Sequence, residues 1–466
     1  MSKIRRLGTL LLALAMIFVF SGCSEANQKG ESEAGGGKDI WDKYPAYDFQ
    51  GRTIKIASHY DLGYGTPVKE MTPEQKQDEI YKRAYYENLT RIAKKYNIEI
   101  NVIVVPWDRY VPTLTASVLS GAPFADIVHL APDLYYPVAA GGYLQPVSSY
   151  ATDVSDVNTD NLSLFKLPPI AGGESVAVAR NVKPGGFHDF LGYNKKIFDS
   201  LGVETPTSLY EKGEWTWENF LKLAKLTTKD TDGDGKNNYW GYSGRPLIDT
   251  LLATNDGVLV DDKSLKEMIT SKNTVEALEF ARQFDQAKVI YQLNNDPFDY
   301  KNTELFREGV SSMFGLVGYL IFNKDTPVPF DFHVVPLPKG PSNTSGKLMR
   351  VAPEAFAIPN GVKDADKVYQ VFEELHMWFN HDYELVEQND MNYLETGLQT
   401  QEDIDMVWEL SPKYYIDYSF SITQLAALWH RTVSEQAITG KSVSTLVESN
   451  KQVAQDIIDQ FFRKEQ

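Results

Sequence analysis

The chain of 466 residues is 42% hydrophobic and 12% aromatic, so it can bury more than one core and suits two domains. Its formal net charge of −17 argues against a nucleic-acid partner, because an acidic surface is repelled by a phosphate backbone. The single cysteine excludes an internal disulfide, and the sequence contains no P-loop, no zinc-protease motif and no serine-hydrolase elbow.

The N-terminus has the pattern of a secretory signal. Three basic residues precede an apolar run from Leu7 to Phe20, which is shorter than the roughly 20 residues that span a bilayer. Cys23 follows Ser21-Gly22, a pattern that resembles the lipobox of bacterial lipoproteins, in which the cysteine is acylated, for example with palmitate. We therefore expect a signal peptide over residues 1–22 and a mature protein that is lipid-anchored at the extracellular face of the membrane.

Residues 23–45 are predicted to be a flexible tether. The stretch from Ser24 to Lys38 is rich in Gly, Ser and Glu and has almost nothing to bury. The folded part of the chain is therefore expected to work outside the cell, close to the membrane.

The first folded segment alternates strands and helices. The predicted elements are a strand at 53–57, a helix from Thr72 to about Tyr96, a strand at 98–104, a helix at 110–120 and a strand at 125–130. This order predicts a mainly parallel sheet with helices on both faces. Ligands bind outside the carboxyl ends of such strands, which here are His59-Tyr60, Trp107-Asp108 and residues 129–133.

A less regular stretch at 151–186 separates this segment from a second α/β region. The elements predicted there are a strand at 190–194, a helix at 216–225, an acidic loop at 230–235, helices at 273–287 and 303–308, a strand and turn at 332–340, and helices at 364–380 and 421–462.

Short motifs follow one another in this second region. They are LGYNKKIF from Leu191, GV at 202–203, WTWENF from Trp215, FREGVSSM from Phe306, VPLPKGP from Val335, AIPNGV from Ala357 and AITGKSV from Ala437. Together they resemble the family-1 extracellular solute-binding proteins, which include maltose- and oligosaccharide-binding proteins. Each motif alone is weak, and their order makes the match.

The resemblance implies an α/β fold of the periplasmic-binding-protein-like type II, with two α/β lobes, a hinge that the chain crosses more than once and a ligand cleft between the lobes. Lobe 1 is expected at 46–172 plus 346–385, and lobe 2 at 173–345 plus 386–466. A ligand that contacts both lobes favours the closed form, which an ABC transporter permease then recognises. The expected protein is a monomer that captures a carbohydrate, in particular an oligosaccharide, and is not an enzyme.

The candidate ligand-binding residues lie near strand ends or beside the matched motifs, where aromatic faces could stack on sugars and polar groups could bond hydroxyls. They are Tyr60, Trp107, Asp126, Trp240, Tyr242, Arg245, Tyr319, Glu354 and Trp429. A structural role competes for three of them, because Trp240 and Trp429 could pack in a core and Asp126 could cap a turn.

The acidic loop has the spacing of a calcium loop. Oxygen side chains occupy positions 1, 3, 5 and 9, and a glycine at position 6 permits the sharp turn, but position 12 is Gly241 instead of Glu. The predicted structural calcium ligands are Asp230, Asp232, Asp234, the backbone carbonyl of Lys236, and Asn238. A metal-free, Asx-rich turn is the alternative.

Two other functions remain compatible with the sequence. One is a secreted carbohydrate-active enzyme, since two acids distant in sequence suffice for glycoside hydrolysis. The other is a ligand-binding partner of a membrane sensor kinase. A peptide or polyamine ligand also fits.

Overall fold

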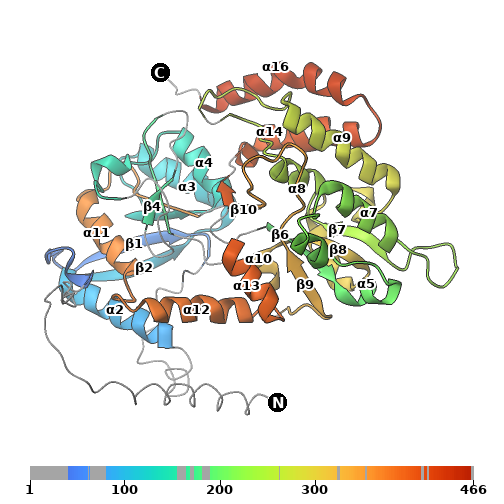
Figure 1. The fold of residues 1–466 in the computed structure, drawn as a ribbon. Coiled ribbons are helices and arrows are strands. Elements are labelled where there is room, and N and C mark those ends of the chain that lie inside the picture. The colour runs from blue at the N-terminus through green and yellow to red at the C-terminus, as the bar shows by residue number, and fades with distance from the viewer. Residues whose placement is uncertain are drawn as a thin grey trace, which may run out of the picture.

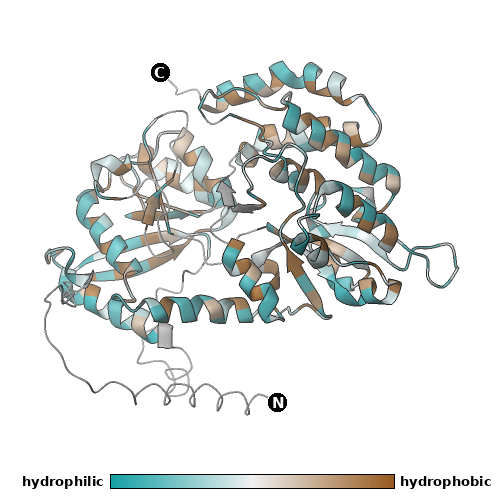
Figure 2. Ribbon diagram, viewed as in Figure 1, coloured by the Kyte–Doolittle hydropathy of each residue, from teal (hydrophilic) through white to brown (hydrophobic). Residues whose placement is uncertain are grey.

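The computed structural model describes residues 40–60, 62, 80–154, 164–167, 173–180, 189–261, 263–296, 298–322, 326–351, 354–410, 414–416 and 419–462. In these residues the chain forms two α/β lobes, which stand side by side around separate sheets (Figure 1). The strands are mostly apolar, whereas the helices alternate apolar and polar residues, as expected of helices that cover a sheet (Figure 2).

Lobe 1 contains a six-stranded sheet in the order β2-β1-β3-β11-β5-β4. Strands β1, β2 and β3 are parallel, whereas β11 runs antiparallel to β3 and β5. All four residues of β3 are buried, as in a strand covered on both faces. The strands are β1 (Arg52–Ser58), β2 (Ile98–Val104), β3 (Ile127–Leu130), β4 (Leu164–Lys166), β5 (Val178–Arg180) and β11 (Ala355–Ala357).

Helices cover both faces of this sheet and create two cores. Leu89, Ile92 and Tyr96 recur at helical spacing in α2 and pack in one core with α11. Residues of α3 and α4 fill the core on the opposite face. The helices are α2 (Ile80–Tyr96), α3 (Trp107–Leu119), α4 (Pro132–Ala140), the short turn η4 (Val147–Ser149) and α11 (Ala365–His376).

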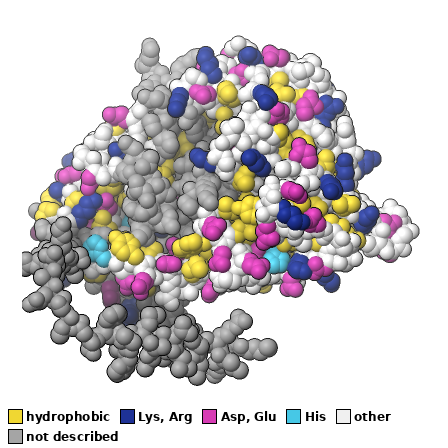
Figure 3. All heavy atoms as spheres, viewed as in Figure 1, with side chains coloured by type: hydrophobic (Ala, Val, Ile, Leu, Met, Phe, Trp, Pro, Cys, Tyr) yellow, Lys and Arg dark blue, Asp and Glu magenta, His cyan; other side chains and the backbone are white. Residues whose placement is uncertain are grey.

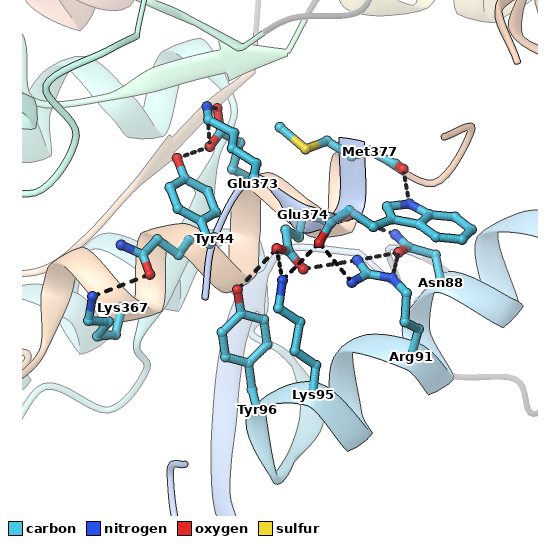
Figure 4. Close-up of polar contacts among 12 residues, drawn as sticks. Tyr44, Asn88, Arg91, Lys95, Tyr96, Lys367, Glu373, Glu374 and Met377 are labelled. Carbon is cyan, nitrogen blue, oxygen red and sulfur yellow. Dashed lines mark hydrogen bonds and ion pairs between the residues drawn. The ribbon is translucent and has the colours of Figure 1, made fainter. Parts of the chain in front are cut away.

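The segment that begins at η2 (Ile40–Asp42) is fixed to lobe 1 by a cluster of charges (Figure 4). Glu374 is fully buried and pairs with Arg91 at 2.9 Å and Lys95 at 2.5 Å. Lys95 also donates to the carbonyl of Trp41, whose indole N–H donates to the carbonyl of Met377. Because α2 ends just before β2 begins, this cluster lies toward the amino ends of the parallel strands.

Lobe 2 contains a four-stranded sheet in the order β7-β8-β6-β9. Strand β7 is parallel to β8, and β6 is antiparallel to β8 and β9. The register places the carboxyl ends of β7 and β8 and the amino end of β6 at one edge. The strands are β6 (Asp189–Asn194), β7 (Trp240–Gly244), β8 (Ser311–Val317) and β9 (Phe332–Val335).

The helices of lobe 2 pack around two further cores, one on each face of its sheet. Thr216 caps α7 and Ser271 caps α9, in each case by accepting from the backbone N–H three residues on. The elements are α5 (Lys195–Leu201), α6 (Pro206–Glu211), α7 (Trp217–Thr227), α8 (Leu247–Thr254), α9 (Lys272–Ala287), η6 (Leu293–Asn295), η7 (Tyr300–Glu308), α10 (Gly318–Ile321), α13 (Gln401–Leu410), η8 (Ser419–Ser421), α14 (Thr423–Ala427), the π-helix η9 (Leu428–Ser434), α15 (Glu435–Ile438) and α16 (Val443–Phe462).

Separate elements link the lobes. Strand β10 (Met349–Val351) pairs in parallel with β12 (Tyr414–Ile416) and contacts β6 and α8 of lobe 2, just before the chain enters β11 of lobe 1. Helix α12 (Tyr383–Glu395) runs from α2 of lobe 1 to α13 of lobe 2 (Figure 1). The chain therefore crosses between the lobes more than once, as the sequence motifs imply.

Most predicted elements are present, and the lobe boundary differs. The helix start expected at Thr72 lies outside the described residues, in which α2 is seen from Ile80. The boundary expected at 172–173 falls too early, because Val178–Arg180 pairs with β11 and β4 in the sheet of lobe 1. The irregular composition of this stretch, which hides two three-residue strands, explains the error.

Acidic and basic side chains are intermingled over both lobes on the face in Figure 3, so the net negative charge is not gathered in one patch of that face. In the part of the chain that the structure describes, no helix is both long and apolar enough to cross a bilayer.

Candidate functional site

Residues from four strand ends of lobe 1 meet at one edge of its sheet. Ser58 lies beside His129 in the register, and Glu354 precedes β11 at the same edge because β11 is antiparallel. Tyr60 follows β1, and Trp107 follows β2. We call these residues, together with His59, the lobe 1 edge.

A carboxylate organises the lobe 1 edge. The Tyr60 hydroxyl donates to Glu354 Oε2 at 2.9 Å, and His129 Nε2 lies 3.0 Å from the same oxygen. On its other side His129 Nδ1 contacts the Ser58 hydroxyl at 2.9 Å. His129 and Ser58 are fully buried. Of these four hydrogen-bonded residues, Glu354 and Tyr60 are therefore the two that reach the surface.

Burial and the neighbouring groups oppose each other at Glu354, whereas at His59 burial and a neighbouring histidine act in the same direction. Burial alone would raise the pKa of Glu354, but the contacts from His129 and Tyr60 outweigh it and lower that pKa. Burial lowers the pKa of His59, and neighbouring His129 lowers it further. The lobe 1 edge therefore presents an ionised carboxylate beside a neutral imidazole near neutral pH.

Aromatic rings surround that carboxylate. The ring of His59 contacts Trp107 edge-on at 5.0 Å and Tyr60 edge-on at 4.7 Å. Trp107 is 48% exposed and Tyr60 is 38% exposed, which is unusual for side chains of this size. Exposed rings beside an oriented carboxylate can stack on an apolar ligand face and accept from its hydroxyls.

Lobe 2 has a hollow at the equivalent place, the carboxyl end of β7. This pocket of about 730 Å³, a volume that includes the open space at its mouth, is called the lobe 2 pocket. It lies among β7, α8, α9, α15 and the segment after α9. Its lining residues are Tyr242, Gly244, Arg245, Pro246, Leu247, Ile248, Ala281, Asp285, Ile290, Tyr291, Gln292, Phe298, Asn302, Glu435, Ile438 and Thr439.

Arg245 stands at the rim of the lobe 2 pocket because the chain turns sharply before it. Gly244 has a φ of +104°, and a Cβ there would come within 2.5 Å of the carbonyl oxygen of Gly315. Arg245 then pairs with Asp189, at the amino end of β6, at 3.1 Å. The guanidinium is held in place by this contact and remains partly exposed.

Three stacked rings connect the pocket with the segment that contacts lobe 1. His430, in the π-helix η9, stacks on Phe298 at 4.5 Å and on Phe420 at 5.5 Å. Next to Phe420, the Ser421 hydroxyl lies 3.2 Å from Asp133 of α4 in lobe 1. Wide helical turns of this kind recur at functional sites, and this one adjoins η8, which packs on α4 of lobe 1.

The structure brings four predicted ligand residues to the exposed surface of these two places: Tyr60, Trp107 and Glu354 at the lobe 1 edge, and Arg245 at the rim of the lobe 2 pocket. Tyr242 also lines the pocket, but as a buried side chain. Asp126 is elsewhere. It precedes β3, pairs with Arg52 and accepts from the backbone N–H of Lys55, so it ties together the amino ends of the strands, at the opposite edge of the sheet.

Three other predicted residues are not placed as ligand contacts. Tyr242 is 1% exposed and donates to the carbonyl of Arg245, and Trp429 is fully buried in the core of lobe 2. Trp240 begins β7 and does not line the pocket, but it stacks at 5.7 Å on Tyr291, which does. Tyr319 lies in α10, and its side chain is outside the described residues.

The acidic loop is separate from both places. Asp230, Asp232 and Asp234 are exposed, and their carboxylates approach within 4.8 Å of one another. Backbone N–H groups of Gly233 and Gly235 lower the pKa of Asp230. The side-chain amide oxygen Oδ1 of Asn238 accepts from both the backbone N–H and the hydroxyl of Thr231 and so faces into the loop.

Several residues of these places are not among the predicted ligand residues, namely His59, His129, Phe298 and His430. The strand pattern had placed His59 and His129 at the carboxyl ends of two strands, where ligands bind, without marking either as a ligand contact. No local signal marks Phe298 and His430, because their contact joins segments far apart in the sequence.

Comparison with known families and structures identifies the class of protein. Residues 76–375 match the model of the bacterial extracellular solute-binding proteins. This match spans most of the chain, and the chain belongs to that family. The expected family is thereby confirmed, and a search of the curated proteins found no match.

Solved structures show the same two-lobed fold. The ABC substrate-binding protein Lmo0181 from Listeria monocytogenes, in complex with cycloalternan, matches with a TM-score of 0.56 and 19% identity over 88% of this chain and 98% of that one. The maltose/maltodextrin-binding domain MalE from Bdellovibrio bacteriovorus, bound to maltotriose, matches with a TM-score of 0.54 and 16% identity over 88% and 99%. UgpB from Mycobacterium tuberculosis, in complex with glycerophosphocholine, matches with a TM-score of 0.56 and 15% identity over 88% and 99%. The predicted fold class is confirmed.

Proposed function

We propose that this protein captures a carbohydrate, in particular an oligosaccharide, between the lobe 1 edge and the lobe 2 pocket, and delivers it to the permease of an ABC importer. The observation that carries the proposal is the pairing of exposed rings with an oriented carboxylate at the lobe 1 edge. Sugars offer both an apolar face and hydroxyl donors, and this combination recognises both.

The fold supports capture by closure. Separate elements link the lobes, so the lobes can rotate about them while each sheet stays intact. A ligand that touches both lobes stabilises the closed form by its differential affinity for that form. Two of the similar solved structures hold oligosaccharides, cycloalternan in one and maltotriose in the other, which favours the same class of ligand here.

Binding without turnover fits the lobe 1 edge better than catalysis. Ser58, His129 and Glu354 stand in a line with contacts of 2.9 and 3.0 Å, which resembles a nucleophile, a base and an orienting acid. The Ser58 hydroxyl is fully buried and the base is buried with it, so a substrate carbonyl has no approach. These groups hold Glu354 in position instead.

A thermal-shift and calorimetric screen tests this proposal. We expect at least one neutral, amino or acidic saccharide to raise the melting temperature and to remain intact after prolonged incubation. Failure of every saccharide to bind would remove the carbohydrate proposal, and release of cleaved products would replace it with an enzyme.

We also propose that Cys23 is acylated and anchors the protein at the extracellular face of the membrane. The lipobox-like pattern before it and the Gly- and Ser-rich stretch after it support this. Cells given a labelled fatty acid should label the wild-type protein and not the Cys23→Ser variant. Equal labelling of the two proteins would exclude Cys23 as the anchor.

We further propose that the acidic loop holds a structural calcium ion. Three close carboxylates repel one another, and hard oxygen ligands suit calcium. The fit is partial, because the side-chain oxygen of Asn238 already accepts hydrogen bonds from Thr231. Calcium should raise the melting temperature of chelator-treated protein, and an unchanged value in both the wild type and the Asp232→Asn variant would show a metal-free turn.

A further inference from the structure

The N-terminal segment reaches the point where the chain leaves lobe 1. We call residues 40–44 the strap. The indole N–H of Trp41 donates to the carbonyl of Met377 at 2.6 Å, and Met377 is the C-cap residue of α11. The same carbonyl accepts from the backbone N–H of Asn380 at 3.3 Å. A single acceptor therefore connects the strap with the turn that leads from α11 into α12.

Helix α2 holds the groups that precede this point. The side-chain amide of Asn88 donates to the backbone carbonyl of Glu374 at 2.8 Å and to that of Leu375 at 3.4 Å. The carboxylate of Glu374 is fully buried and pairs with Arg91 and Lys95 (Figure 4). The last carbonyls of a helix have no partner within it, so groups from other segments have to satisfy them. The C-terminal end of α11 is thereby fixed to the rest of lobe 1.

The turn after α11 is the place where this crossing between the lobes changes direction. Its residues Asn380 and His381 have φ values of +42° and +67°, a left-handed conformation that is uncommon for residues other than glycine. Beyond the turn, α12 begins beside α2 of lobe 1, and near its end Leu394 packs in a core of lobe 2. A rotation of lobe 2 that carries α12 with it therefore changes the backbone between residues 378 and 382.

We propose that Trp41 is a positioning residue of the hinge: through the Met377 carbonyl, the strap fixes the lobe 1 side of the turn at residues 378–382 and confines bending of this crossing to that turn. This inference rests on the proposed capture by lobe closure and names a device that guides it. A hinge with one fixed end directs lobe 2 along a narrow path, whereas a frayed end of α11 spreads the movement over the helix.

Amide hydrogen exchange of the ligand-free wild-type protein gives the first test. The amides at residues 378–382 should exchange about tenfold faster than those in the middle of α11 and of α12, because the turn opens locally while the two helices stay intact. Exchange at the turn that is as slow as in both helices would exclude bending there. That result would overturn the proposal whether or not any variant folds.

A conservative variant isolates the hydrogen bond of Trp41. Trp41→Phe removes the donor and keeps an aromatic ring beside the guanidinium of Arg91, which lies 4.9 Å from the centre of the Trp41 ring. Exchange over residues 376–383 should become about fivefold faster, since one hydrogen bond is lost. Trp215→Phe is the matched control, because the Trp215 indole N–H donates to the carbonyl of Pro336 at 2.8 Å within lobe 2. Unchanged exchange in Trp41→Phe, or an equal increase over all of lobe 1, would show that Trp41 has no special role at the hinge.

Distances between the lobes test the consequence for movement. Spin labels at Leu119→Cys in α3 and Leu226→Cys in α7, two exposed positions in different lobes, report this distance in protein that also carries Cys23→Ser. Trp41→Phe should widen the distance distribution about twofold, and Trp215→Phe should leave it unchanged. A distribution of unchanged width in Trp41→Phe would overturn the hinge role. These measurements need no ligand, so their outcome is independent of the saccharide screen, which alone decides the carbohydrate proposal.

Discussion

The two lobes build corresponding surfaces in opposite ways. At the lobe 1 edge the carboxylate of Glu354 already has two partners in the protein, Tyr60 and His129, and exposed rings stand around it. In the lobe 2 pocket the carboxylates of Asp285 and Glu435 are exposed, and polar and apolar side chains share the walls. Lobe 1 therefore offers a preorganised carboxylate, whereas lobe 2 offers an open hollow of mixed polarity.

The lobes also differ in how their histidines respond to acid. His376 of lobe 1 is largely buried, and this burial lowers its pKa to about 3. In lobe 2, His333 Nδ1 lies 3.0 Å from an Asp403 carboxylate oxygen, and this contact raises the pKa of His333. Protonation of His376 therefore lowers the stability of lobe 1, whereas protonation of His333 raises the stability of lobe 2.

The largest expected effect is the loss of lobe 1 stability in acid. Because the folded-state pKa of His376 lies below its ordinary value of 6.5, the folded state binds fewer protons, and stability falls once the pH drops below about 6.5. Lowering the pH to about 4 should cost about 3 kcal/mol from this group. Urea titrations at stepped pH measure it.

His376→Gln should be less stable at neutral pH and should show a shallower acid dependence. His333→Gln is the control with the opposite sign: a raised pKa gives stability that is present below the ordinary value and is lost as the pH rises through the raised value. An acid slope that His376→Gln leaves unchanged would mean that other groups set the stability of lobe 1.

The second effect is a loss of stability that should be larger for the hydrogen-bonded carboxylate of Glu354 in lobe 1 than for an exposed carboxylate. Glu354→Gln removes the charge on which His129 and Tyr60 converge, and we expect it to lower the free energy of unfolding by about 2 kcal/mol. The control is Glu308→Gln, because Glu308 also accepts from a tyrosine, Tyr291, but in an exposed place. Comparable losses in the two variants would show that Glu354 has no special role in holding the lobe 1 edge.

The third effect is mainly on binding. Trp107→Ala should weaken the affinity for the saccharide found in the screen about tenfold, because an exposed ring contributes by stacking on the ligand. Its free energy of unfolding should fall by only about 1 kcal/mol, since the ring is half exposed and packs edge-on against His59. Full affinity in this variant would move the ligand away from the lobe 1 edge.

Strand ends are the part of the site that the sequence could predict. Alternating and helical periodicities predicted β1, α2, β2, α3 and β3, and the parallel order then placed Tyr60 and Trp107 at a shared edge. The prediction of Asp126 as a ligand residue differs from the structure for a related reason. It precedes its strand, and a residue before a parallel strand lies at the amino edge, away from ligand.

Lobe 2 was harder to predict because its site depends on contacts between distant segments. Trp429 looked like a helical residue with an open choice of face, but η9 is a π-helix, and its wide turn buries Trp429 while His430 stacks on Phe298. Periodicity of 3.6 residues cannot report that change of face. The pocket combines β7 with residues up to Thr439 and leaves no local pattern.

The smallest expected effect tests which end of the lobe 2 sheet faces the ligand. Trp240 and Arg245 lie at opposite ends of β7, and only Arg245 lines the pocket. Trp240→Ala should therefore keep its saccharide affinity within about twofold while losing about 1 kcal/mol of stability with its stacking on Tyr291. Calorimetry beside urea unfolding measures both. A Trp240→Ala variant that stays stable and loses affinity as strongly as Trp107→Ala would place ligand at the amino end of β7. That result would contradict the lobe 2 pocket as the counterpart of the lobe 1 edge.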